Sequence, residues 1–230
     1  MIRTKNISIC ICALTISLLT VVPLNANAQR KQTATVVKDT IPLFHGVAVS
    51  VDAVGAFQRW FGSYGQYEAA ARINLKDRYF PVVELGIGTA DHEDEVTTIR
   101  YKTTAPYGRI GCDFNVLKNK HDIYRVYIGF RYGFTSFKYD ISSEAGIKDP
   151  IYKTISEYEG KGLKSNFQWG EFLVGVDAKI YGPLRFGWIV RYRNRFKQTH
   201  GDMGQSWYVP GFGVNKSSAL GATFNIIFEL

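Results

Sequence analysis

The sequence predicts an all-β protein, an eight-stranded antiparallel up-and-down transmembrane β-barrel preceded by a cleaved signal peptide. Three observations lead to this prediction: a secretory signal pattern over residues 1–28, a dominant period-2 alternation of apolar and polar residues from Gly46 onward, and connections that alternate between short and long. Helical periodicity is weak throughout the rest of the chain, which is typical of an all-β fold.

The first 28 residues are expected to be removed during export. A short basic start is followed by an uncharged stretch, and Ala26-Asn27-Ala28 supplies small residues where signal peptidase cuts. Gln29 is therefore the expected first residue of the mature chain. Residues 29–45 are polar, and we interpret them as an extended periplasmic lead-in to a barrel domain of residues 46–230.

Eight later segments alternate apolar and polar residues, which places one set of side chains on each face of a strand. In the clearest segment, Phe130 and Tyr132 share one face while Arg131 and Gly133 share the other. An even number of strands is typical of single-chain bacterial outer-membrane barrels. The predicted strands are residues 46–58, 67–75, 81–89, 107–116, 124–137, 170–180, 184–196 and 219–230.

The connections support the same topology. Those after the second, fourth and sixth strands are short, while those after the third, fifth and seventh are long, as periplasmic turns and extracellular loops are. The longest predicted loops are Asp140–Ser165 and Lys197–Ser217. No segment after the signal has the roughly 18 consecutive apolar residues of a membrane-spanning helix.

Alternation alone does not say which face of the strands is buried, and a soluble lipocalin-like barrel would put the apolar face inside. Lipid outside is favoured because the apolar faces carry no charge mid-strand, and because the last strand ends with Phe228 and Leu230 on its apolar face. Membrane barrels also carry aromatic girdles near their strand ends. The aromatic residues expected there are Trp60, Phe61, Tyr64, Tyr79, Phe80, Tyr107, Tyr132, Phe134, Trp169, Tyr181, Tyr192 and Phe228.

Composition excludes several other classes. Cys112 is the only cysteine after the signal, so an intramolecular disulfide is impossible, and a closed barrel in lipid supplies the stability that small exported proteins otherwise draw from disulfides. The net charge of +8 is spread over strands and turns rather than gathered in one run. Nucleic acid is therefore not an expected partner.

The polar faces combine arginines with acids, and they predict a structural ion-pair network that fills the barrel. An eight-stranded barrel is just wide enough for side chains, and buried charges must be paired and hydrogen-bonded. Arg125, Lys179, Arg185 and Glu229 also lie on these faces. The predicted network residues are Asp52, Glu68, Arg72, Glu84, Arg109, Asp113, Arg131, Glu171, Asp177, Arg191, Arg193 and Arg195.

The alternative is a narrow pore or a small-anion site in the same lumen. Arg191, Arg193 and Arg195 would form its basic wall, and the lumen bases slightly outnumber the acids.

A third class, a lipid-modifying barrel enzyme, would need a nucleophile and a histidine at the outer rim. His92 lies in an acidic loop, and His200 lies near Asp202 and Ser206 among turn-forming residues. No catalytic, cofactor-binding or metal-binding residue is predicted from this arrangement. The four histidines are His45, His92, His121 and His200.

Several segments resemble an uncharacterised family of outer-membrane β-barrels from Bacteroidota. The resemblance covers nearly all of the mature chain, and it implies a barrel in the outer membrane with no assigned activity. The Gly-Trp-x-x-Arg-Tyr and x-Pro-Gly-x-Gly pieces are its most specific parts. The segments are Asp39–Phe44, Tyr67–Ala69, Phe80–Gly86, Pro106–Gly111, Gly129–Phe134, Gly187–Tyr192 and Tyr208–Gly213.

The sequence thus predicts a small outer-membrane barrel with a plugged lumen, which acts through its extracellular loops as a structural, adhesive or accessory envelope component. The expected partners are outer-membrane lipid and a larger envelope protein complex. The expected location is the outer membrane of a Gram-negative bacterium.

Overall fold

The computed structural model of the 230-residue chain describes residues 42–148, 155–199 and 204–230. The predicted signal peptide and most of the predicted lead-in lie outside the described residues. In this part of the chain, no helix is both long and apolar enough to cross a bilayer.

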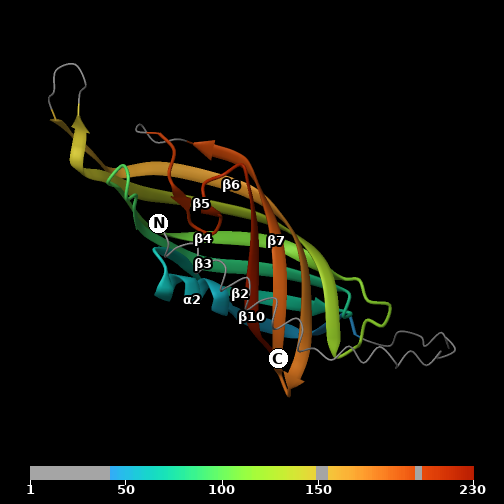
Figure 1. Ribbon diagram of the computed structural model, residues 1–230. Coiled ribbons are helices and arrows are strands. Elements are labelled where there is room, and N and C mark those ends of the chain that lie inside the picture. Colours follow the sequence, from blue (N-terminus) through green and yellow to red (C-terminus); the bar gives the residue numbers. More distant parts are fainter. Residues whose placement is uncertain (1–41, 149–154, 200–203) are drawn as a thin grey trace. The chain divides into compact units, whose positions relative to one another are not determined.

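Eight antiparallel strands form a closed ring (Figure 1). The ring strands are β1 (Phe44–Asp52), β2 (Tyr64–Leu75), β3 (Tyr79–Glu93), β4 (Ile99–Asn115), β5 (Tyr124–Lys148), β6 (Ile155–Tyr181), β7 (Leu184–Thr199) and β10 (Ser218–Glu229). The other elements are helix α2 (Ala53–Phe61) and the short strands β8 (Tyr208–Val209) and β9 (Gly213–Val214). The order around the ring is β1-β10-β7-β6-β5-β4-β3-β2, and the pairing of β1 with β10 closes it. The predicted all-β class and the eight antiparallel strands are confirmed.

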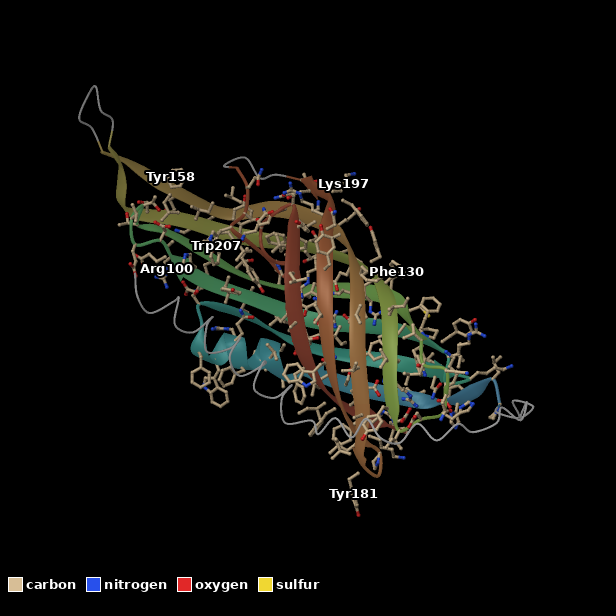
Figure 2. The ribbon with its side chains drawn as sticks, turned by 45° about the vertical axis from the view of Figure 1, so that its right-hand side comes forward. Arg100, Phe130, Tyr158, Tyr181, Lys197 and Trp207 are labelled. Carbon is tan, nitrogen blue, oxygen red and sulfur yellow. The ribbon has the colours of Figure 1, made fainter. Side chains whose placement is uncertain are left out.

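The pleat places apolar side chains outside the ring and charged side chains inside it. On β5, the Phe130 side chain is 57% exposed, whereas the adjacent Arg131 is 4% exposed. On β6, Phe172 is likewise exposed and Glu171 buried. Figure 2 shows Phe130 on the outer surface of the ring. This is the orientation that the alternation pattern predicts for a barrel with lipid outside.

The predicted first strand, residues 46–58, is wrong beyond Asp52, where helix α2 begins. The Asp52 carboxylate accepts hydrogen bonds from the backbone N–H groups of Val54 (3.0 Å) and Gly55 (3.1 Å), which caps the helix N-terminus. The large apolar residues that follow recur three and four positions apart, as on a helix, rather than at every second position.

The loop predicted at Asp140–Ser165 is largely strand. β5 runs on to Lys148 and β6 starts at Ile155, so this hairpin continues past the ends of the other strands (Figure 1). Alternation persists in the extension, where Ile141 is buried while Asp140 before it is exposed. The segment was predicted as a loop because the side chains on its outer face are polar.

The segment predicted as an outer loop at Lys197–Ser217 is wrong in part, because much of it folds into the ring. Its residues from Ser206 to Phe212 are buried, apart from the half-buried Trp207. The short β8–β9 pair holds this inserted stretch in a tight turn.

The predicted aromatic girdles are correct for most positions and wrong for four. Trp60 and Tyr132 are exposed on the outer surface, but Phe80, Tyr107 and Trp169 are each at most 4% exposed and lie inside the ring. Tyr64 is half-buried and packs inside the ring against Trp207 and Tyr208. Each of these four lies an even number of residues from a buried charge on the same strand, and therefore faces inward with it.

Candidate functional site

The interior of the ring, here called the lumen, contains two layers of side chains. A charged layer lies toward the short turns that follow β2, β4 and β6, and an aromatic layer lies toward the β5–β6 hairpin. Tyr181 lies at the first end and Tyr158 at the second (Figure 2). The aromatic layer consists of Ala90, Tyr101, Ala105, Tyr107, Phe137, Tyr139, Ile141, Phe167, Trp169, Tyr208, Val209 and Phe212.

Glu84 on β3 is the centre of the charged layer. Its carboxylate accepts hydrogen bonds from Arg109 (2.8 Å), Arg131 (3.0 Å) and Arg191 (2.6 Å). These arginines come from β4, β5 and β7, so one carboxylate joins strands on different sides of the ring. Charge-assisted bonds of this kind are about twice as strong as neutral ones.

Three further carboxylates, those of Glu68, Asp113 and Glu171, complete this central cluster, and Asp113 lies 2.8 Å from Arg131. Arg109 also contacts Glu68 (2.6 Å) and Glu171 (3.0 Å), and Arg193 lies 3.5 Å from Glu171. The lumen of the ring is thereby crossed several times by ion pairs. The central cluster consists of Glu68, Glu84, Asp113, Glu171, Arg109, Arg131, Arg191 and Arg193.

A second set of ion pairs, the turn-end cluster, lies nearer the short turns. Asp177 binds Arg72 (3.1 Å) and Arg185 (2.7 Å), while Glu229 binds Arg125 (2.7 Å) and Arg185 (3.3 Å). Arg185 therefore links β6 to the closing strand β10. The turn-end cluster consists of Arg72, Arg125, Arg185, Asp77, Asp177 and Glu229.

The charges of the two clusters balance, with seven arginines and seven carboxylates. The slight excess of bases expected from the sequence is wrong, because Lys179 is exposed and Arg195 donates to the amide oxygens of two neighbouring side chains. Of the predicted network residues, Arg195 and the helix-capping Asp52 lie outside the clusters.

Asp77 is the lumen residue that the sequence did not predict. It occupies the three-residue turn between β2 and β3, where its φ of 52° is one that Asp tolerates better than most residues. Its carboxylate lies 2.8 Å from His121 and 3.1 Å from His45. Burial raises the pKa of Asp77, but hydrogen bonds from Asn74 and the two histidines outweigh it and lower the pKa to about 2.

This turn predicts an acid-sensitive contribution to stability. Because the folded pKa of Asp77 is lowered, its contribution is complete above an unfolded pKa of about 4 and is lost as the pH falls toward 2. In urea titrations in detergent micelles, Asp77→Asn should flatten the fall of the unfolding midpoint over this range. A fall of the same size in both proteins would show that other groups cause it.

The arginines of the central cluster also hold the inserted loop, residues 204–217. Arg109 donates to the carbonyl oxygen of Gly211 (2.7 Å), and Arg193 donates to that of Phe212 (2.8 Å). Both guanidinium groups thus use donors that the carboxylates leave free. The charged layer and the loop are therefore a single hydrogen-bonded unit.

The tip of the inserted loop approaches the ring wall very closely. Gly211 has a φ of +81°, and a Cβ there would lie 2.5 Å from the ring of Tyr107. The Tyr208 hydroxyl donates to the carbonyl oxygen of Gly65 on β2 (3.2 Å). Glycine is needed at the tip both for its conformation and for its lack of a side chain.

Little space remains in the charged layer. The cavity beside Glu84, Arg131 and Tyr127 measures about 20 Å³. A single water molecule needs roughly 10–15 Å³ by this measure. The arrangement can therefore hold about one water molecule at that level, and it leaves no room for a ligand.

The histidines do not assemble a reactive site in the described residues. His92 stacks on the indole of Trp207 with ring centroids 4.1 Å apart, and His45 and His121 flank the turn carboxylate described above. His200 lies outside the described residues. In the same part of the chain, no group of three or more His, Cys, Asp and Glu side chains is arranged to hold a metal ion.

Comparisons with known proteins add a family and a structural likeness. The sequence matches a family described as a domain of unknown function (DUF6048) over residues 7–229. Among solved structures, a major outer membrane protein from Thermus thermophilus is similar at 15% identity, with a TM-score of 0.40, over 81% of this chain and 100% of that chain. No curated protein matches the sequence.

Proposed function

The chain belongs to the DUF6048 family, and on that premise we propose that it is a small outer-membrane β-barrel with a closed lumen. It acts through its outer rim as a structural, adhesive or accessory envelope component, in contact with membrane lipid and with a larger envelope complex. The signal pattern supports export, and the resemblance to barrels from Bacteroidota supports a Gram-negative source. The observation that carries the proposal is the apolar belt around a charged interior.

The height of this belt fits a membrane. On β5, the outward side chains are apolar from Tyr124 to Phe134, and polar ones follow at Ser136 and Lys138. Ten residue steps of about 3.3 Å, tilted by about 40°, rise by about 25 Å. That is the height of the apolar band of outer-membrane barrels.

The balanced charges and close packing of the lumen support a plug. They argue against the alternative function, a narrow pore or small-anion site. The charges cancel within the two clusters, and the remaining cavity holds about one water molecule. An anion would find no unmatched arginine in the central cluster. The inserted loop adds a second closure above the charged layer.

The outer rim supports a role in binding. Past Phe134, the β5–β6 hairpin extends beyond the belt (Figure 1). The outward side chains of β5 in this part are polar, at Ser136, Lys138 and Asp140. A groove of about 210 Å³ there is lined by Arg100, Lys102 and Asp140, among other charged residues. It is smaller than the roughly 300–1,000 Å³ of a small-molecule site, which favours contact with a macromolecular surface.

Reconstitution of the mature protein in planar bilayers separates the plug from the pore. The protein should insert and show no steady single-channel conductance. A steady anion conductance that Arg193→Ala abolishes would instead establish the narrow pore.

Localisation is tested in cells of the source organism. The protein should remain in the membrane pellet after alkaline washing, and an epitope inserted at residues 149–154 should be cleaved by protease added to intact cells. Recovery in the soluble fraction would contradict the proposal. Co-purification from native outer membranes would then identify the envelope partner.

A further inference from the structure

Strand β1 lies between β10 and β2 in the ring, but it pairs with only part of each of them. We call the unpaired stretch between β10 and β2 the seam. β1 pairs with β10 only from Ala48 to Asp52, opposite Asn225–Glu229. The rest of β10, Ser218–Phe224, has no β1 partner, and neither has β2 from Tyr64 to Glu68. Helix α2 follows Asp52 directly and packs against both β2 and β10 at this point (Figure 1).

Helix α2 is seated on the backbone of β2. A Cβ on Gly65 would lie 2.3 Å from the backbone nitrogen of Arg59, and a Cβ on Gly55 would lie 2.7 Å from the Gln66 side chain. Such contacts are possible only because both positions are glycine. The helix is therefore fixed in the seam by close backbone packing, as well as by its Asp52 cap.

The other side of α2 presents large aromatic side chains to the surroundings. Phe57, Trp60 and Phe61 are 54%, 83% and 62% exposed. The rings of Phe57 and Phe61 lie 4.4 Å apart and those of Trp60 and Phe61 6.3 Å apart, so the three form one patch. A contiguous exposed apolar patch marks a contact with a membrane or a partner.

The neighbours of this patch belong to the apolar belt. On β10, Leu220 is 76% exposed and lies beyond the last residue pair with β1. On β2, Tyr67 is 56% exposed and also lies beyond that pairing. The helix thus continues the apolar outer surface from one of these strands to the other.

We propose that α2 is a lipid-facing part of the barrel wall, with its aromatic patch (Phe57, Trp60 and Phe61) in contact with the lipids of the outer leaflet. A helix suits this place because it satisfies its own backbone hydrogen bonds where water is excluded. Tryptophan is enriched at the membrane–water interface. The inference rests on the proposed function, and the continuity of the patch with the belt favours lipid over a protein partner.

Fluorescence quenching by brominated lipids tests the contact. Trp60 is read in a Trp188→Phe background, since Trp188 faces outward on β7 while Trp169 and Trp207 lie in the lumen. In vesicles of brominated phosphatidylcholine, the tryptophan emission of the Trp188→Phe variant should fall at least about twofold more than that of the Trp60→Phe/Trp188→Phe double variant. Gly65→Val, which displaces α2 from its seat, should change the extent of quenching.

The opposite single variant, Trp60→Phe, keeps Trp188 as a reporter of the belt. If Trp188 is quenched and Trp60 is not, α2 lies outside the lipid and the inference fails, while the membrane barrel stands. If Trp60 is quenched by aqueous iodide instead, it faces water; if neither quencher reaches it, a protein surface covers it. Both results overturn the inference. If neither tryptophan is quenched by lipid, the proposed function itself fails.

Discussion

Replacing Glu84 by glutamine is expected to lower the free energy of unfolding by about 3–5 kcal/mol, the cost of removing one partner from a buried ion pair. The variant keeps the shape of the side chain but takes the negative charge from Arg109, Arg131 and Arg191. Urea titration in detergent micelles, followed by tryptophan fluorescence, measures the loss.

The matched control is Asp91→Asn. Asp91 forms a two-pronged ion pair with Arg100, but both side chains are 40% or more exposed. Exposed pairs contribute at most about 1 kcal/mol, so this variant should unfold close to the wild-type midpoint. Equal losses in the two variants would mean that the Glu84 pairs are hydrated and that the lumen is more open than the geometry indicates.

Replacing Phe212 by alanine is the second large effect that we expect, about 3–5 kcal/mol. The ring is fully buried and lies 4.9 Å from the ring of Phe167 and 6.0 Å from that of Trp169. Its removal leaves a cavity between the inserted loop and the wall, so limited proteolysis should also cut the loop faster.

Phe196→Ala is the control for this variant, because Phe196 lies on the outer surface of β7 and is 67% exposed. It removes the same side chain without leaving an interior cavity, so most of the stability should remain. If Phe212→Ala left both the unfolding midpoint and the rate of cleavage unchanged, the loop would not be docked in solution.

The sequence predicted the strands of the ring and their two faces well, but it predicted the segments at the ends of the strands poorly. Period-2 alternation identified the inward charges such as Glu84 and Arg191, because a strand pattern depends only on which residues share a face. Tyr107 and Trp169 were assigned outward from their place near strand ends, although their parity with lumen charges places them inside. The even spacing of these residues from a lumen charge was a better indicator of the face they occupy than their aromatic type.

What the sequence could not provide depends on contacts between distant segments. The inserted loop is fixed by hydrogen bonds from Arg109 and Arg193 to its backbone carbonyl groups. No local sequence pattern predicts such contacts, because the partners are far apart in the chain. Asp77 was overlooked since a short polar turn normally faces water. Helix α2 was missed because a β-like stretch of valines runs directly into it.

The ion pairs of the interior join residues from seven different strands, and several of them cross the ring: Glu84 of β3 meets Arg191 of β7, and Arg72 of β2 meets Asp177 of β6. A half-built wall would therefore leave bare ions facing hydrocarbon, with their counterparts still on unassembled strands. For the outer-membrane barrel proposed above, we therefore expect the two edges of the sheet to meet before the strands enter the bilayer, rather than insertion hairpin by hairpin.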